Sequence, residues 1–240
     1  MENIHLDIKP KVVTLTITRE HAGNMFDLSM IHAMTQHIHT VSTEAYCIVI
    51  RGAGADFCRG RDPSTAGAHP TPMALRDNLL LPIMDLYDAI KSSKIPVIAV
   101  VQGRALGLGC AIAGVCDITI ADESALFQLP EMQYHLPPTL AISAIVDKIG
   151  KKSTAWMAYS LDKMDAHRAR EMGLINSVVP VGKLDAELER LLDTLTQRDL
   201  MAVKAVKEYL HVAPESGPAV RSMASNLLAL ALSTQAAQKS

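Results

Sequence analysis

Residues 96–110, with the sequence PVIAVVQGRALGLGC, contain the change of local structure around which the rest of the chain is arranged. The run at 97–101 is continuously apolar, which is typical of a strand covered on both faces. Three glycines follow, at 103, 107 and 109, and the apolar pattern of a helix comes next. Backbone N–H groups at such a strand-to-helix turn have no helical acceptor, so the turn is a candidate site for negative charge.

A second glycine turn, at 56–62 with the sequence DFCRGRD, follows a β-rich run at 46–50. Taken alone, each glycine is equally typical of an ordinary tight turn. Two such turns side by side would point two N–H groups at one oxygen atom and so form an oxyanion hole.

The residues around these turns predict an α/β fold. Residues 13–17 alternate between apolar side chains and threonine, which predicts a strand with one buried face. Apolar residues spaced by three or four predict a helix from about residue 30, with Ser29 as its N-cap. A third apolar run at 118–121 predicts another strand.

The second half of the chain is predicted to be helical. A helical pattern at 75–90 contains Pro82, which should kink or restart that helix. From about Pro138 onward the pattern is almost wholly helical, and it includes an amphipathic stretch at 184–195. We therefore expect one α/β core with a helical C-terminal region and no linker between them.

Composition and missing motifs narrow the function. The net charge of −2 does not favour nucleic acid or an anionic membrane, and no apolar run approaches the ~20 residues of a membrane span. The four cysteines show no CxxC spacing, which favours reduced, buried thiols. No secretory signal is recognisable, so a cytoplasmic location is expected. The chain lacks GxSxG, P-loop and HExxH motifs, and the spacing of its glycines is wrong for dinucleotide binding.

Both glycine turns, together with FQLPE at 127–131 and MGLINSVVP at 172–180, resemble the crotonase (enoyl-CoA hydratase/isomerase) superfamily. The resemblance implies a spiral ββα core over residues 1–180 and a helical region at 181–240 in the same structural unit. It implies trimerisation through that region, as a homotrimer or hexamer, and no nucleic-acid or membrane partner. The substrate would be a coenzyme A thioester, with no separate cofactor and no metal.

Matched residue by residue, the resemblance implies roles for particular positions. The backbone amides of Arg59 and Leu108 would hold the thioester oxygen, and Glu131 would be the acid–base group. Substrate contacts would come from residues around the two turns and beyond Glu131, namely Gly60, Asp62, Gly107, Gly109, Ala111, Tyr134, His135 and Pro138. One of Arg59, Arg61 and Arg104 is expected to touch the ligand. Lys204 and Lys207 resemble lysines that approach the CoA phosphates.

This sequence departs from the family pattern at several of these positions. Ala111 replaces one of the two carboxylates of the hydratases, and Glu131 alone remains. A single glutamate is sufficient to move a proton between carbons, so double-bond isomerisation is favoured over hydration. Leu108 stands where glycine is usual, which would cost ~1–2 kcal/mol if its φ were positive. Prolines at 137 and 138 replace a glycine-rich stretch and should reshape the acyl pocket.

Two alternatives stay open. One is hydration of an unusual enoyl-CoA, with Tyr134 or His135 replacing the lost carboxylate. The other is a homologue without catalytic activity that binds acyl-CoA or acts as a trimeric scaffold.

Overall fold

The computed structural model describes residues 3–41, 44–65, 67, 71–213 and 222–229. Within them, a six-stranded sheet has the order β1-β2-β3-β4-β6-β9. β1 and β2 pair antiparallel, and every later pair in this sheet is parallel. The strands are β1 (Ile4–Ile8), β2 (Val12–Ile17), β3 (Cys47–Gly52), β4 (Val97–Val101), β6 (Ile118–Asp122) and β9 (Ser177–Val179).

The strands predicted from alternation and from apolar runs are confirmed, whereas β9 corrects the expectation of an almost wholly helical second half. β9 has three residues and extends the main sheet beside β6. A strand this short leaves too little alternation in the sequence to be recognised.

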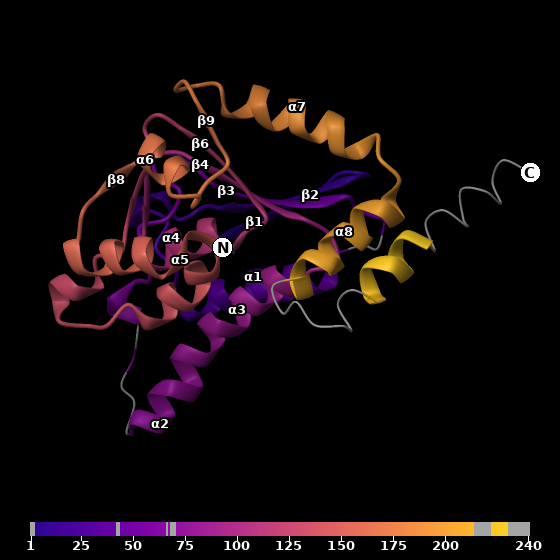
Figure 1. Ribbon diagram of the computed structural model, residues 1–240. Helices are drawn as coiled ribbons and strands as arrows, with labels where there is room; N and C mark the ends of the chain where they lie inside the picture. Colours follow the sequence, from indigo (N-terminus) through magenta and orange to yellow (C-terminus); the bar gives the residue numbers. More distant parts are fainter. Residues whose placement is uncertain (1–2, 42–43, 66, 68–70, 214–221, 230–240) are drawn as a thin grey trace, which may run out of the picture.

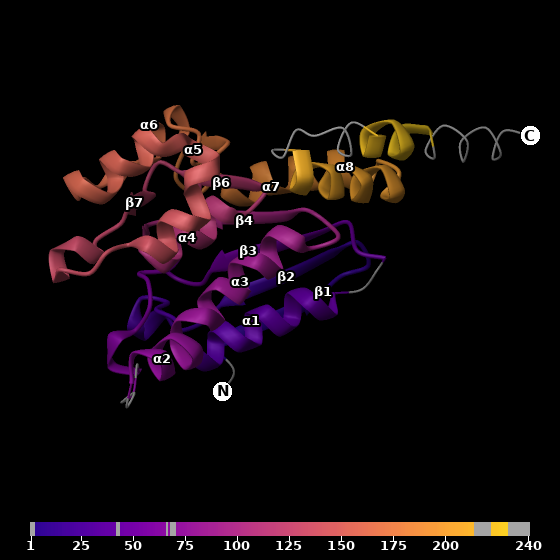
Figure 2. The same ribbon diagram turned by 60° about the horizontal axis from the view of Figure 1, so that its bottom comes forward.

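Helices cover both faces of the main sheet (Figures 1 and 2). On one face α1 (Leu28–Thr40) and α3 (Leu81–Ser92) pack on Ile48 and Ile50 of β3. On the other face α7 (Leu184–Thr196) packs on Cys47 and Val49 of the same strand. Neighbouring side chains of a strand point to opposite faces, so all of β4 is buried between these two layers, as its apolar run predicts.

Particular side chains determine where α1 and α3 begin. Asp27, not Ser29, caps α1: its carboxylate accepts a 2.9 Å bond from the Met30 N–H and a 2.6 Å bond from the Ser29 hydroxyl. The negative charge of the carboxylate also interacts favourably with the positive N-terminal end of the helix dipole. Pro82 lies in the first turn of α3, directly after a π-helical turn at Arg76–Leu80, so the predicted restart of the helix is confirmed.

A second, three-stranded sheet brings the glycine turn of residues 103–109 beside the segment that carries Glu131. β5 (Arg104–Leu106) pairs in parallel with β7 (Leu126–Gln128), which pairs antiparallel with β8 (Met164–Asp165). The glycine turn leads into α4 (Leu108–Val115), and β7 leads into a 3₁₀ turn at Glu131–Tyr134. The remaining helices are α2 (Pro72–Leu75), α5 (Thr139–Ser160), α6 (Ala166–Glu171) and α8 (Leu200–Val212).

Candidate active site

The two glycine turns lie side by side, as the sequence predicts. Cys58 and Ala105 form a parallel β-bridge: the Cys58 N–H donates to the Arg104 carbonyl at 3.0 Å and the Leu106 N–H to the Cys58 carbonyl at 2.9 Å. The next residues of the first turn bridge Phe26 in the same manner. Backbone hydrogen bonds and the ion pair of Asp56 with Arg104 therefore hold the two turns together.

The Arg59 amide is not available to a ligand, which corrects one predicted role. Its N–H donates to the Gly23 carbonyl at 3.0 Å. Two residues further on, the bridge to Phe26 uses the Gly60 carbonyl and the Asp62 N–H. Peptide groups alternate in direction along an extended segment, so the Arg61 N–H points away from Phe26.

The amides of Arg61 and Leu108 lie close together. A Cβ built on Gly60 would be 4.0 Å from the Leu108 nitrogen and 3.2 Å from the Leu106 carbonyl oxygen, and Gly60 immediately precedes Arg61. Leu108 is the first residue of α4, so its N–H has no helical acceptor. Within the described part of the chain, neither amide donates a hydrogen bond. The Arg61 amide, two residues after the predicted Arg59, is therefore the candidate donor in the first turn.

Leu108 is not strained, because the positive φ belongs to the residue before it. Gly107 has φ 50° and ψ −113°, whereas Leu108 is not among the residues with positive φ. The expected cost of leucine at this position therefore does not arise. A Cβ on Gly107 would lie 2.7 Å from Glu131 Oε1, so glycine is also required for space. Gly109 has a similar role, because it packs against the Cys58 carbonyl.

Glu131 reaches this point because the strand before it is bonded to the turn. The Gly107 N–H donates to the Gln128 carbonyl at 2.9 Å, and Glu131 follows three residues later. Its Oε2 atom is enclosed and has no hydrogen-bond partner, and it is the only such side-chain atom in the described residues. Burial raises the pKa of Glu131 above the ordinary value, and its own backbone amide opposes this shift to a smaller extent. A raised pKa is what an acid–base group needs.

The surroundings of Glu131 are apolar and neutral. Phe127 and Leu129 are fully buried beside it, as predicted, whereas Leu136 is 55% exposed and cannot enclose it within this chain. Burial raises the pKa of the Cys58 thiol to about 12 and that of Cys110 even further, so both stay protonated. Ala111, at the position of the lost carboxylate, is completely buried.

Tyr87 is a fully buried aromatic residue that no sequence motif singles out. It comes from α3, is 2% exposed, and is packed in the same core cluster as Cys58, Cys110 and Ala111. In the sequence it occupies a position on the buried face of a helical pattern, where an aromatic side chain needs no functional explanation.

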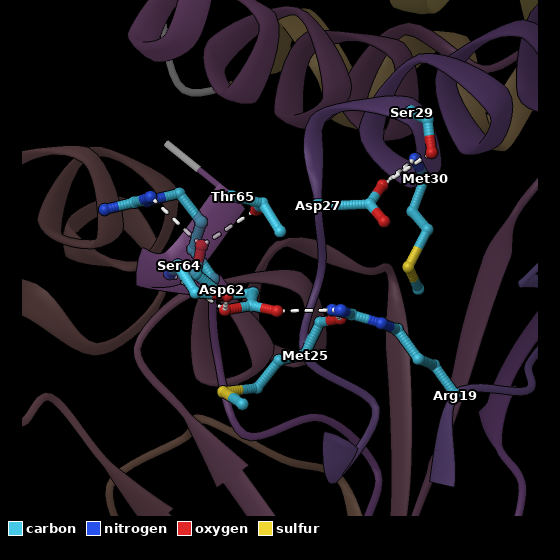
Figure 3. Close-up of polar contacts among 9 residues, drawn as sticks. Arg19, Met25, Asp27, Ser29, Met30, Asp62, Ser64 and Thr65 are labelled. Carbon is cyan, nitrogen blue, oxygen red and sulfur yellow. Dashed lines mark hydrogen bonds and ion pairs between the residues drawn. The ribbon is translucent and has the colours of Figure 1, made fainter. Parts of the chain in front are cut away.

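Asp62 supports the first turn through its carboxylate. Figure 3 shows its carboxylate between Arg19 and Ser64. Oδ2 pairs with the Arg19 guanidinium at 2.7 Å, and Oδ1 accepts from the Ser64 hydroxyl at 2.6 Å and from its N–H at 3.0 Å. These Ser64 and Arg19 contacts lower the pKa of Asp62. The predicted substrate contact of Asp62 stays a prediction, and the observed role of its carboxylate is to hold the turn.

Two of the predicted ligand-binding cations are also bound elsewhere. Arg104 makes a bidentate pair with Asp56, with bonds of 2.8 and 2.7 Å. Lys207, 5% exposed, donates to both Asp117 oxygens and to the Ile90 carbonyl, which corrects its expected place near CoA phosphates. The contacts of Arg59, Arg61 and Lys204 with a ligand stay predictions.

The residues beyond Glu131 lie on the surface of this chain. Tyr134 is 71% exposed and His135 is also exposed, so neither is enclosed with the Glu131 carboxylate. Pro138 is buried and lines an apolar cavity of about 330 Å³, together with Met132, Ile142 and Ala158. A larger groove of about 760 Å³ lies between α7 and β1–β3 and contains no predicted site residue. Because that groove is remote from both glycine turns, we do not place the chemistry there.

The described residues form neither a metal-binding cluster nor a membrane-spanning helix. Residues in the described ranges include no group of three His, Cys, Asp or Glu side chains that could hold a metal ion. Crossing a bilayer would need a longer or more apolar helix than any in this part of the structure.

A parallel sheet wrapped by helices, two adjoining glycine turns and one enclosed carboxylate define a protein of the crotonase fold. The model of the enoyl-CoA hydratase/isomerase family matches residues 7–240, so the chain belongs to that family. The chain is 27% identical over 222 residues to the 2,3-dehydroadipyl-CoA hydratase of Escherichia coli, covering 90% of this chain and 84% of the relative.

Solved structures agree with this assignment. An enoyl-CoA hydratase from Mycobacterium smegmatis superposes with a TM-score of 0.91 at 26% identity, over 96% of this chain and 91% of the other. A protein from Thermobifida fusca in complex with CoA superposes with a TM-score of 0.87 at 26% identity, over 98% and 95% of the two chains.

Proposed function

We propose that the protein acts on enoyl-CoA thioesters and moves their double bond between the 3- and 2-positions, with Glu131 as the single acid–base group. The observation that carries this proposal is the Glu131 carboxylate, whose Oε2 atom is enclosed without a partner, while the buried Ala111 stands where hydratases have a second carboxylate. The Thermobifida fusca relative in complex with CoA supports a CoA thioester as the ligand.

The Arg61 and Leu108 amides would bind the thioester oxygen. Both lack acceptors in the described structure, and they adjoin one another across Gly60. Donors fixed in place before the reaction stabilise a developing oxyanion without reorganising, and removing one costs ~2.7–4 kcal/mol in other enzymes. The bridges of Cys58 and Phe26 provide that fixed geometry.

The proton transfer then requires one base. Ionised Glu131 removes a proton from C2 of the 3-enoyl thioester, and the electron pair moves into a dienolate whose oxygen is held by the two amides. Protonated Glu131 returns the proton to C4, the double bond reforms between C2 and C3, and the carboxylate is regenerated. The raised pKa of Glu131 favours the second step, because an acid–base group transfers protons most effectively when its pKa lies near the working pH.

Hydration is a second candidate, because relatives such as the Escherichia coli protein are named as hydratases. It would need a group other than a carboxylate to hold the water. Tyr134 and His135 are exposed in this chain, so they are weaker candidates for that role than a buried group.

Incubation with 2-enoyl- and 3-enoyl-CoA in D2O, followed by mass spectrometry, tests the proposal. Double-bond movement with deuterium uptake, and without a gain of water, is expected. Glu131→Gln should abolish both while CoA still binds, and Glu171→Gln, which changes an exposed ion pair, should alter neither. Full activity of Glu131→Gln would refute the assignment, and a gain of one water by the wild type would establish hydration instead.

A further inference from the structure

The backbone ladder that joins the two glycine turns is extended by a side chain. In this ladder the Cys58 N–H donates to the Arg104 carbonyl, and the Leu106 N–H donates to the Cys58 carbonyl. The same parallel alternation would send the Arg104 N–H to the Asp56 carbonyl. It donates instead to Asp56 Oδ1, at 3.0 Å. The Asp56 carboxylate therefore takes the place of its own carbonyl in the ladder.

Asn24 explains why the ladder does not use the Asp56 carbonyl. The side-chain NH₂ group of Asn24 donates to that carbonyl at 2.7 Å and to the Ala53 carbonyl at 2.8 Å. Asn24 is 1% exposed and has φ 56°, a conformation that asparagine adopts more readily than most residues. The ladder can therefore continue only through a second acceptor of the same residue, which is the carboxylate.

Arg104 binds the Asp56 carboxylate with its side chain as well as with its backbone. Nε donates to Oδ1 at 2.8 Å, and Nη2 donates to Oδ2 at 2.7 Å. The Asp56 side chain is 10% exposed, so water competes little for its oxygens. Three charge-assisted bonds between two residues fix their orientation as well as their distance.

Few backbone bonds set the register between the two turns, that is, which residue of one turn lies opposite which residue of the other. Beside the two bonds made by Cys58, the Phe57 N–H donates to the Gln102 carbonyl at 2.9 Å. Short, glycine-rich pairs of strands specify their register weakly. An ion pair that joins the same two segments can therefore decide it.

We propose that Asp56 and Arg104 are positioning residues, whose ion pair sets the register of the two glycine turns and with it the separation of the Arg61 and Leu108 amides. Each partner lies shortly before one of these amides in the same turn, Asp56 before Arg61 and Arg104 before Leu108. The inference rests on the proposed function, in which the two amides bind the thioester oxygen. Loss of the pair should displace one amide relative to the other without removing either.

The carbonyl of a bound thioester reports on the two amides directly. Infrared difference spectra are recorded for butyryl-CoA, labelled with ¹³C at the thioester carbonyl, bound to wild type, Arg104→Met and Asp56→Asn. Butyryl-CoA has no double bond to move, so the bound ligand keeps its structure. Two N–H groups aimed at the oxygen should lower the C=O stretching frequency in the wild type. Each variant should keep about half of this downshift, because one of the two amides no longer points at the oxygen.

Kinetics with 3-butenoyl-CoA should show the same displacement as a loss of kcat. A misplacement of about 1 Å costs about 10²-fold in rate, and we expect a loss of this order in Arg104→Met and Asp56→Asn. KM should stay near the wild-type value, because neither substitution removes a group that we place against the CoA. Arg104→Lys keeps the charge without the bidentate geometry, so it should recover kcat only in part.

Arg168→Met is the matched control. Arg168 pairs with Glu171 on the surface of α6 and is 57% exposed, so its loss should change neither the carbonyl frequency nor kcat. Melting temperatures are measured for every variant, and spectra and rates are recorded well below the lowest of them.

The outcomes separate positioning from stability. If Arg104→Met and Asp56→Asn melt earlier but keep the wild-type downshift and kcat, the ion pair is only structural and the proposal is overturned. If the wild type binds butyryl-CoA without any downshift, the proposed pair of amides fails, and this inference fails with it. That result is distinct from a normal downshift that the variants retain.

Discussion

Glu131 is the residue at which stability and activity conflict. A carboxylate enclosed without a partner is costly when ionised, yet ionisation is what a base requires. The pKa of Glu131 is raised above its ordinary value of 4.5. We therefore expect the rate of isomerisation to increase as the pH rises through this raised pKa, with an inflection above that of a free glutamate. An inflection at or below 4.5 would contradict the burial argument.

The same pKa shift predicts how Glu131 affects stability. A carboxyl whose folded-state pKa is raised binds its proton more tightly in the folded protein, so its contribution to stability is complete below the unfolded pKa and is lost as the pH rises through the folded pKa. Glu131→Gln, which cannot ionise, should therefore melt above the wild type at pH 8, with a difference that shrinks toward pH 4. Activity should fall by ~10²–10⁴-fold. A lower melting temperature at pH 8 would contradict this prediction.

Glycine is required at position 107 for two reasons, its positive φ and the close approach of Glu131, and the two can be tested separately. Gly107→Ala would impose a backbone cost of ~1–3 kcal/mol and would also place a methyl 2.7 Å from Glu131 Oε1. Gly182→Ala is the matched control, because Gly182 has φ 81° but open space around its Cβ position. Both variants should lose stability in urea titrations, and only Gly107→Ala should lose activity by 100-fold or more. Equal activities of Gly107→Ala and Gly182→Ala would show that the Glu131 side chain can shift away from the added methyl without loss of function.

At the scale of elements, the turn of residues 56–62 depends on Asp62. Asp62→Asn would lose the charge-assisted bonds to Arg19 and Ser64, which should loosen the turn and lower kcat about tenfold. Because the pKa of Asp62 is lowered, its stabilisation is present above the unfolded pKa of 3.8 and is lost as the pH falls through the folded pKa. The melting difference from wild type should therefore persist to about pH 4 and close below it. Asp7→Asn, in an exposed pair with Lys9, should show little difference at any pH.

Helices and strands with a strong hydrophobic period could be predicted from the sequence. The residues at which they end, and the hydrogen bonds they make, could not. β2 and β4 were evident from alternation and from a continuous apolar run. The sequence predicts Ser29 as the cap of α1, because serine and aspartate are both good caps and only the backbone distinguishes Asp27. The motif predicts the Arg59 amide as a donor, because a motif cannot show that this N–H group is already bonded to Gly23.

In the molecule as a whole, motifs within one segment of the chain could be recognised from the sequence. Contacts between segments that are distant in the sequence could not. The motifs predict Glu131 and both glycine turns, whereas the packing of Tyr87 from α3 in one core cluster with α4 has no signal in the sequence. The family resemblance predicts Lys207 near the CoA phosphates, and its actual partner Asp117 lies 90 residues away in the sequence. Long-range partners of this kind leave no local signal.

Lys207 therefore belongs to the structure that joins α8 to the core. Its ammonium bonds Asp117 at 2.9 and 2.7 Å and the Ile90 carbonyl at 3.0 Å, and Asp117 also accepts from the Val97 N–H at 2.7 Å. Lys207→Met would leave that carboxylate without its counterion, because the methionine cannot replace the charge. We expect a loss of ~3 kcal/mol in the free energy of unfolding, at the lower end for buried pairs because Asp117 is partly exposed.

Urea titration of Lys207→Met, of Asp117→Asn and of the double variant measures this coupling. The double variant should regain more than half of the loss, since removing the orphaned charge removes most of the penalty. Lys9→Met, which breaks an exposed pair, should change stability by less than ~1 kcal/mol. If Lys207→Met were as stable as Lys9→Met but bound CoA more weakly, the lysine would face the ligand after all, and α8 would be held to the core by its apolar contacts alone.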